Sequence, residues 1–199
     1  DSKIIDGFKS SGGFNDEVDL TYASILSLAV AKKLDRSQHE FIFDVISNAD
    51  PSGILSVEKY LETLVDIDEI KNKLSYPGIR NDNPIYKIFD QIFYGPELYG
   101  RLFKHESQFL EPGLIENDII IVNNFLIEKL QKKFSSKISI VSGRGKESIR
   151  YSLKQLLDNF DAQNSAFLED EPRELAKPNP ISLVRSIKGM NCKHCIYVG

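Results

Sequence analysis

A serine and two glycines follow an apolar run in the segment Lys137–Ser148, KISIVSGRGKES. The run ends at Ser142, where the spacing of apolar residues changes from that of a strand to that of a helix. The first amides of a helix have no partner within the helix and lie at its positive end, so an anion fits there. The hydroxyl of Ser142 and the amides of Gly143 and Arg144 therefore form a candidate phosphate site. The alternative is that Ser142 caps the helix and the glycines only form the turn.

A lysine between prolines is the second candidate for chemistry. Lys177 lies in EDEPRELAKPNP, Glu169–Pro180, and is followed by Pro178 and Pro180. Proline restricts the backbone and suits the first turn of a helix. A lysine held beside a helix start can neutralise a phosphoryl oxygen as a compact charge. The alternative is an ordinary exposed loop lysine.

Other phosphate and metal motifs are incomplete. A dinucleotide-binding fingerprint needs a third glycine where Ser148 stands, and a P-loop needs Ser or Thr where Glu147 stands. Cys192 and Cys195 form one CxxC pair around a histidine, and one pair cannot complete a tetrahedral zinc site. A packing role is therefore expected for Cys195.

Strands and helices alternate in the half of the chain that carries these residues. The apolar spacing predicts, in order, helix 119–134, strand 138–141, helix 146–160, strand 166–168, helix 181–188 and strand 195–198. This order is typical of a parallel sheet with right-handed crossovers. Ligands bind beyond the carboxyl ends of such strands, where Ser142 and Glu169 stand.

The first half of the chain is predicted to be helical. Apolar residues recur at helical spacing in 24–34, 38–46, 57–67 and 85–95. The loop Ser10–Asp16, which contains two glycines and an aromatic residue, precedes the first of these helices. Within it Gly13, Phe14 and Asn15 are candidates for contact with a substrate, and the alternative is an ordinary turn.

Composition excludes several classes of function. The chain has 199 residues, a formal net charge of −4 and two cysteines. It therefore lacks the basic charge that nucleic-acid binding needs and the cysteines of a disulfide framework. No apolar run is long enough for a membrane span, and the N-terminal DSKIIDGFKSS is not a signal peptide. Neither nucleic acid nor a membrane is an expected partner, and the cytoplasm is the default location.

Three segments in order carry a resemblance to a known family. ISIVSGR, ELAKPNP and CIYVG resemble the second, third and fourth motifs of the haloacid dehalogenase-like (HAD) hydrolase superfamily. The helical first half resembles the α-helical cap of the phosphoglycolate phosphatase and β-phosphoglucomutase subfamily. The resemblance covers essentially the whole chain. It implies an inserted helical cap at 1–112 and, at 113–199, part of an α/β core with a doubly wound, Rossmann-like parallel sheet.

This resemblance implies a Mg²⁺-dependent phosphatase-type hydrolase that acts on small phosphorylated metabolites through an aspartyl-phosphate. Ser142, Gly143 and Arg144 would bind the phosphoryl group, and Lys177 would be the catalytic residue that offsets its charge. The family's nucleophilic aspartate, acid/base and Mg²⁺ ligands have no counterpart in this sequence. They are therefore expected outside it, in a longer protein, and the 199 residues alone are expected to be inactive.

Two rival interpretations stay open at the level of sequence. One is a non-catalytic module of the same fold that binds a ligand or a partner. The other is a different chemistry of the same superfamily, performed by a mutase, a dehalogenase or a phosphonatase. The sequence predicts no particular oligomeric state.

Overall fold

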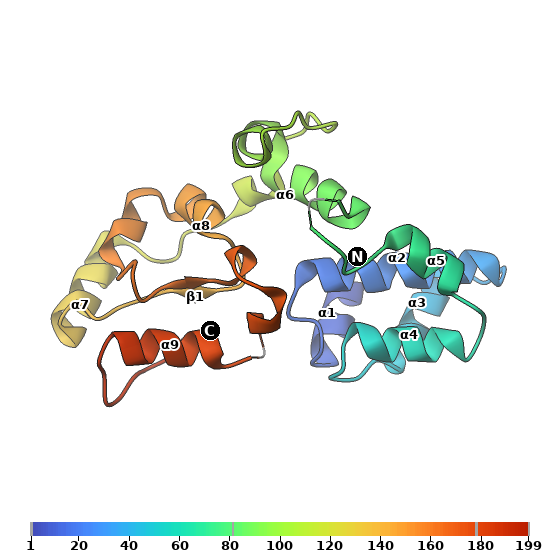
Figure 1. Ribbon diagram of the computed structural model, residues 1–199, viewed down its shortest axis with the longest axis horizontal. Helices are drawn as coiled ribbons and strands as arrows, with labels where there is room; N and C mark the ends of the chain where they lie inside the picture. Colours follow the sequence, from blue (N-terminus) through green and yellow to red (C-terminus); the bar gives the residue numbers. More distant parts are fainter. Residues whose placement is uncertain (1, 81, 178, 199) are drawn as a thin grey trace. The chain divides into compact units, whose positions relative to one another are not determined.

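The computed structural model describes residues 2–80, 82–177 and 179–198 (Figure 1). The chain forms two compact units, Asp1–Ile92 and Phe93–Gly199. Helices make up 59% of it and strands 2%. The boundary between the units does not identify a cap or a core. The domains at 1–112 and 113–199 therefore stay a prediction.

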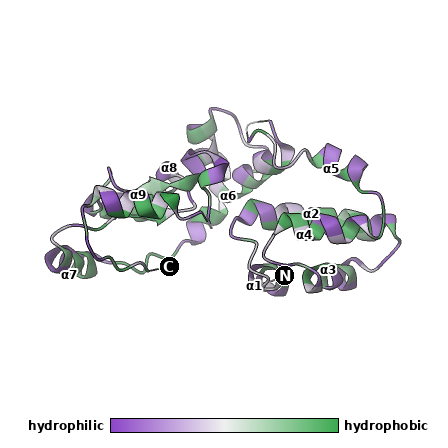
Figure 2. Cartoon of the chain, turned by 60° about the horizontal axis from the view of Figure 1, so that its bottom comes forward, coloured by the Kyte–Doolittle hydropathy of each residue, from purple (hydrophilic) through white to green (hydrophobic). Residues whose placement is uncertain are grey.

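The first unit is built from helices alone among its described residues. They are α1 (Ser2–Ser10), α2 (Glu17–Lys33), α3 (Gln38–Ser47), α4 (Ile54–Glu62), α5 (Asp68–Leu74) and the first part of α6 (Pro84–Phe103). Helix α2 packs against α3, α4 and α5, and α1 packs against α3. In Figure 2 hydrophobic and hydrophilic residues share the ribbons of α2 and α4, as expected for helices with one buried side.

Helix α2 contributes much of the core of this unit. The Asp16 side chain caps it by accepting a hydrogen bond from the amide of Val18 at 2.8 Å, which satisfies one of the unpaired donors at the helix start. The core that α2 joins is closed and apolar, and its largest fully buried side chains are Tyr22, Phe8, Phe41, Leu26, Ile42, Leu61 and Ile67. Burial of this apolar surface is the main force that holds the unit together.

The helix that joins the units in sequence is interrupted. Within α6 the backbone of Gly95 has φ 68° and ψ 170°, which is not helical, and Pro96 follows it. Positive φ carries little cost for glycine, and proline lacks the amide that would continue the ladder of hydrogen bonds. These two residues account for the break in the helix.

Both strands of the described chain lie in the second unit. After α6 it contains η1 (Leu114–Asn117), α7 (Asn124–Phe134), β1 (Val141–Ser142), α8 (Lys146–Leu153), η2 (Lys154–Asn159), β2 (Ala166–Phe167), η3 (Leu168–Asp170), η4 (Arg173–Leu175) and α9 (Ile181–Gly189), where η denotes a 3₁₀ helix. The two strands pair in parallel, and α9 packs on both. Figure 1 shows α8 on the other side of the strands. The parallel β–α–β order predicted for this segment is therefore present, in a much reduced form.

The predicted fold class, a partial doubly wound Rossmann-like sheet, is wrong. Among the described residues the sheet has two strands of two residues each. The predicted strand 138–141 is reduced to β1, and the predicted strand 195–198 is not a strand. A strand needs a neighbour to bind its amides and carbonyls. Ile196 and Val198 are 73% and 87% exposed, so neither has the covering that a central strand of a parallel sheet requires.

Candidate phosphate site at the end of β1

The carboxyl ends of the two parallel strands lie beside each other. Val141 pairs with Ala166 and Ser142 with Phe167. The pairing extends one residue further back, where the carbonyl of Ile140 accepts a hydrogen bond from the amide of Ala166 at 2.8 Å. Parallel strands place their carboxyl ends at one edge of a sheet, so the turns that follow both strands begin at that edge.

The turn after β1 is closed by its own serine. The amide of Arg144 donates to Oγ of Ser142 at 3.1 Å, as in a turn formed by a serine side chain. Gly143 between them is exposed, and no atom lies within 4 Å of the position that a Cβ would take. The backbone at Gly143 therefore faces open space, and a ligand can approach it closely.

The side chain of Arg144 is engaged within its own unit. Its guanidinium donates to the carboxylate of Asp118 at 2.5 Å and to the hydroxyls of Ser148 and Ser152 at 2.8 and 2.9 Å. It also lies over the ring of Phe93, 5.4 Å from the centroid. The guanidinium of Arg144 is thus held by Asp118 and the two serines, and its amide by the hydroxyl of Ser142.

The carboxylate of Asp118 is stabilised in its charged form. Its partial burial on its own would raise its pKa, but the hydrogen bonds from Ser152 and Arg144 and the charge of Arg144 hold the pKa below the ordinary value. The carboxylate of Asp118 is therefore charged near neutral pH, and its negative charge offsets the positive charge of Arg144.

Two carboxylates occupy the N-terminus of α8. The amide of Gly145 donates to Oε2 of Glu169 at 2.7 Å, and the amide of Lys146 donates to Oδ2 of Asp170 at 2.8 Å. Tyr94 donates its hydroxyl proton to the same Glu169 carboxylate, with distances of 2.9 and 3.0 Å to its two oxygens. Negative groups suit this end of a helix. The position of Glu169 and Asp170 directly after a predicted strand was the signal in the sequence, although it did not predict this contact.

Lys177 lies in the loop between η4 and α9. It is exposed, and its Nζ lies 3.4 Å from the hydroxyl oxygen of Tyr197. No hydrogen bond joins it to Ser142 among the described residues. Pro178, which was expected to hold this lysine, lies outside the described residues. The structure thus brings Ser142, Gly143 and Arg144 together in one turn, and it does not connect Lys177 to that turn.

The candidate substrate loop of the first unit is largely a packing element. Phe14 is 2% exposed, and its ring lies 4.8 Å from that of Phe8. A Cβ on Gly13 would come within 2.3 Å of the backbone nitrogen of Gly53, so this glycine permits two loops to touch. Asn15 is exposed. Of the three candidates, only Asn15 presents its side chain to solvent.

The Mg²⁺ that the resemblance implies has no fitting site in the described part of the chain. No group of three or more His, Cys, Asp or Glu side chains is placed there to hold a metal ion. The carboxylates of Glu169 and Asp170 are committed to amides, and Cys192 and Cys195 are free thiols.

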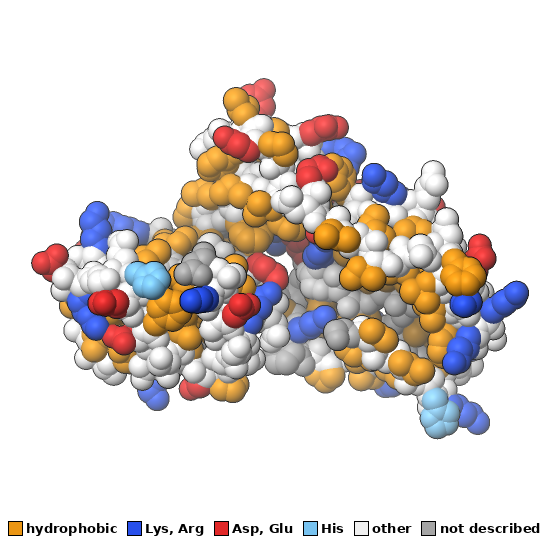
Figure 3. Space-filling view, turned by 180° about the vertical axis from the view of Figure 1, so that it is seen from behind, with side chains coloured by type: hydrophobic (Ala, Val, Ile, Leu, Met, Phe, Trp, Pro, Cys, Tyr) orange, Lys and Arg blue, Asp and Glu red, His pale blue; other side chains and the backbone are white. Residues whose placement is uncertain are grey.

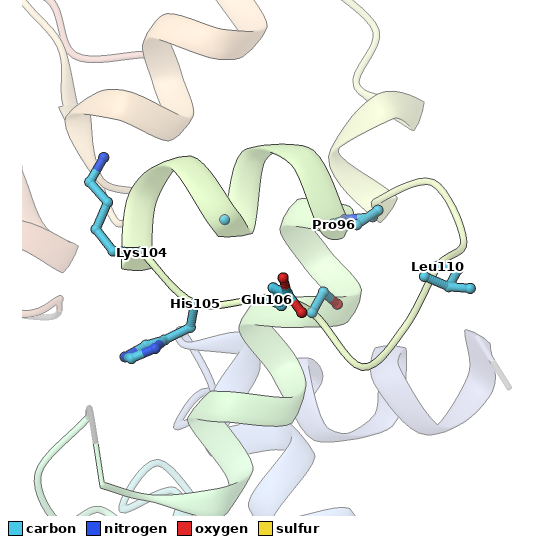
Figure 4. Close-up of a pocket in the computed structure, with 7 residues that line it drawn as sticks. Pro96, Lys104, His105, Glu106 and Leu110 are labelled. Carbon is cyan, nitrogen blue, oxygen red and sulfur yellow. The ribbon is translucent and has the colours of Figure 1, made fainter.

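Two surface hollows lie in the second unit. One, of about 560 Å³, is lined by Pro96, Gly100, Lys104, His105, Glu106, Ser107 and Leu110. Figure 4 shows the side chains of Lys104 and His105 pointing away from Glu106 and from each other. The other, of about 620 Å³, includes Glu116, Asp118, Tyr151 and Ser152 in its lining, and these four residues hydrogen-bond within the lining. The lining of the second hollow also includes Arg101, Glu147, Arg150 and Lys154, so charges of both signs surround it.

On the face in Figure 3, basic, acidic and apolar side chains are interspersed, without a dense basic patch among the described residues. No helix in the described ranges is both long and apolar enough to cross a bilayer.

The chain matches no protein-family model, no curated protein and no solved structure.

Proposed function

We propose that the turn Ser142–Gly143 binds the phosphoryl group of a small phosphorylated molecule, in a hydrolase of phosphate esters. The observation that supports this most directly is the open space in front of Gly143, at the carboxyl end of a parallel strand and three residues before α8. Ser142 would donate its hydroxyl proton to one phosphoryl oxygen, and the amide of Gly143 would donate to the same group.

The chemistry proposed for this turn is positioning and charge neutralisation. Phosphoryl transfer requires mainly these two contributions from a protein. Ser142 and Gly143 would orient the phosphoryl group, and the exposed ammonium of Lys177 would offset its charge. The HAD resemblance supplies the rest of the proposal, an aspartate nucleophile and an aspartyl-phosphate intermediate. The described residues provide no metal site, so the phosphate contacts proposed here use protein groups alone.

A second candidate function is a module that binds a ligand or partner without catalysis. It is favoured because the basic and amide donors near the turn already hydrogen-bond to groups of the chain itself. Arg144 is neutralised by Asp118, and the amides of Gly145 and Lys146 are held by carboxylates. Turnover separates the two functions: release of phosphate from phosphate esters supports the hydrolase, and binding without release supports the module.

Calorimetric titration with glycerol phosphate tests the shared step, which is phosphate binding. We expect Ser142→Ala to weaken binding about tenfold, because it removes a hydrogen bond to a charged group. Ser24→Ala, on α2 in the first unit, is the matched control and should leave binding unchanged. Lys177→Ala should also weaken binding, whereas Lys188→Ala on α9 should not.

Glycerol in place of glycerol phosphate shows whether the phosphoryl group is what binds. Equal heats for the two compounds, or equal affinity of the wild type and Ser142→Ala, would contradict the proposal.

A further inference from the structure

The larger of the two surface hollows has the size of a small-molecule site. Its volume is about 620 Å³, which is ordinary for a pocket that holds a small organic ligand. The lining comes from the end of α6, from η1 and the chain after it, and from α8 with the start of η2. All of these segments belong to the second unit, so the hollow is complete within that unit.

Four charges at this hollow form two neutral pairs. The carboxylate of Asp118 accepts a hydrogen bond from the guanidinium of Arg144 at 2.5 Å. Oε1 of Glu147 lies 3.6 Å from Nε of Arg150, three residues later on α8. Neither pair leaves a net charge for a ligand.

Two further cations of the lining have no ion pair among the described residues. The guanidinium of Arg101 lies 6.0 Å from the centroid of the Tyr151 ring, and Lys154 is exposed. Glu97, one turn before Arg101 on α6, is exposed and lies outside the lining. The remaining acid of the lining, Glu116, accepts a hydrogen bond from the hydroxyl of Tyr151, which is a neutral group. The lining therefore has one positive charge in excess.

The backbone of Lys154 has a conformation that favours glycine. Its φ is 52° and its ψ −128°, where a residue with a Cβ is strained. Strained residues of this kind cluster at sites that bind ligands, because a function maintains them against their cost in stability. This strain is an observation independent of the charges, and it occurs in the same lining.

The composition of the lining indicates the class of ligand. The planar guanidinium of Arg101 can donate two parallel hydrogen bonds to a carboxylate. One excess positive charge suits a ligand with one negative charge, whereas a phosphate ester carries more than one near neutral pH. Ile120 in the same lining is 42% exposed, and contact with an apolar group would remove this surface from water.

We propose that this hollow binds a small organic carboxylate with an apolar ring. Arg101 binds the carboxylate, Lys154 adds a second positive charge, and Ile120 contacts the ring. The proposal does not depend on the phosphate turn, and it gives the second unit a ligand of a different chemical class.

Amide chemical shifts of the purified, ¹⁵N-labelled chain during titration with benzoate test this proposal. We expect the amides of Ile120, Tyr151 and Lys154 to shift. Benzamide has the same ring without the charge, and acetate has the charge without the ring. Each should bind at least about tenfold more weakly than benzoate, because each lacks one of the two contributions.

Substitutions of opposite charge should change the affinity for benzoate in opposite directions. Arg101→Gln should weaken binding about tenfold, because it removes a charged donor. Glu116→Gln should strengthen it, because it removes a negative charge and keeps an acceptor for Tyr151. A role of Glu116 in structure alone would not produce tighter binding.

Lys154 permits a test that separates stability from binding. Lys154→Gly and Lys154→Ala both remove the ammonium and should both weaken binding of benzoate. Lys154→Gly should have the higher urea midpoint of the two, because only glycine adopts this backbone without strain. Lys132→Ala on α7 removes the same charge from an exposed position of this unit, and it should bind benzoate as the wild type does.

Several results would overturn the proposal. They are equal affinity for benzoate and benzamide, shifts confined to residues outside the lining, and wild-type affinity in Arg101→Gln or Lys154→Gly. Because Lys154→Gly is expected to be a stable protein, the test stays decisive if Arg101→Gln does not fold.

Discussion

Two of the three candidate substrate residues in the loop before α2 have a packing role. The sequence indicated Gly13, Phe14 and Asn15 as candidates for a substrate because no packing reason was visible. The structure supplies that reason for two of them: the ring of Phe14 is buried against Phe8, and Gly13 touches Gly53. A local sequence pattern cannot show this, because the partners lie in other segments of the chain.

The role of Phe14 gives a stability prediction. Phe14→Ala should lower the free energy of unfolding by about 3–5 kcal/mol, because it removes a fully buried ring and leaves a cavity. Asn15→Ala, one residue further and exposed, should change it by less than about 0.5 kcal/mol. Urea denaturation measures both. Equal effects of the two substitutions would argue against a core role for Phe14.

The Asp118–Arg144 ion pair predicts how stability depends on pH. The pKa of Asp118 is lower in the folded chain than in the unfolded chain. Its contribution to stability is therefore complete above the unfolded pKa of about 4 and is lost as the pH falls through the lower, folded pKa. Asp118→Asn should be less stable than the wild type near pH 7, and the difference should shrink below about pH 4. A difference in urea midpoint that is constant with pH would contradict this.

At the scale of elements, helical spacing predicted most of the longer helices but not α1 or α5, and strand spacing predicted β1 and β2 but not how short they are. Helical periodicity located α3, because Phe41, Ile42 and Val45 are buried on one side of it. Helix α9 was also predicted, although the residues that it buries are Ser182 and Ser186. Strands depend on a partner that the local sequence does not contain. The apolar residues 195–198 have the composition of a buried strand, yet no other strand pairs with them in the described chain.

Capping residues set some helix boundaries, and they are visible in the sequence. Helix α7 begins at Asn124 instead of 119, because the side chain of Asn123 accepts a hydrogen bond from the amide of Leu126 at 3.0 Å. The residues Ile119 and Ile121 before it are exposed and belong to neither a helix nor a strand. Attention to Asn123 as a cap would have placed this boundary correctly.

The cap of α2 gives a prediction with an internal control. Asp16→Ala should destabilise the chain by about 1 kcal/mol, because Val18 loses the acceptor for its amide. Ser37 stands at the same position before α3 but makes no side-chain cap hydrogen bond, so Ser37→Ala should cost less. Thermal unfolding followed by circular dichroism compares them. A larger loss for Ser37→Ala would show that the hydrogen bond at Asp16 does not stabilise α2.

At the scale of the whole chain, each unit has a core of its own. The larger buried cluster lies entirely within the first unit, and a smaller one around Tyr94, Leu98, Tyr99 and Ile115 lies within the second. The second unit also leaves several large apolar side chains exposed, among them Ile119, Ile121 and Val198. The candidate turn at Ser142 was predicted from sequence, whereas the contacts of Glu169 and Asp170 with the start of α8 depend on the pairing of β1 with β2.

The separate cores predict that residues 1–92 fold without the rest of the chain. This fragment should unfold in one cooperative transition in urea, since it contains every buried residue of the larger cluster. Residues 93–199 should bind a hydrophobic dye more strongly, because they expose more apolar surface. A gradual, non-cooperative transition of the 1–92 fragment would show that its core needs the second unit.

The site of oxyanion binding is the central claim, and a crystal structure with tungstate, an analogue of phosphate, tests it most directly. The account predicts the anion within hydrogen-bond distance of the Ser142 hydroxyl and the Gly143 amide, and its loss in Ser142→Ala crystals. Tungstate bound only elsewhere on the chain, or bound equally in Ser142→Ala, would contradict it.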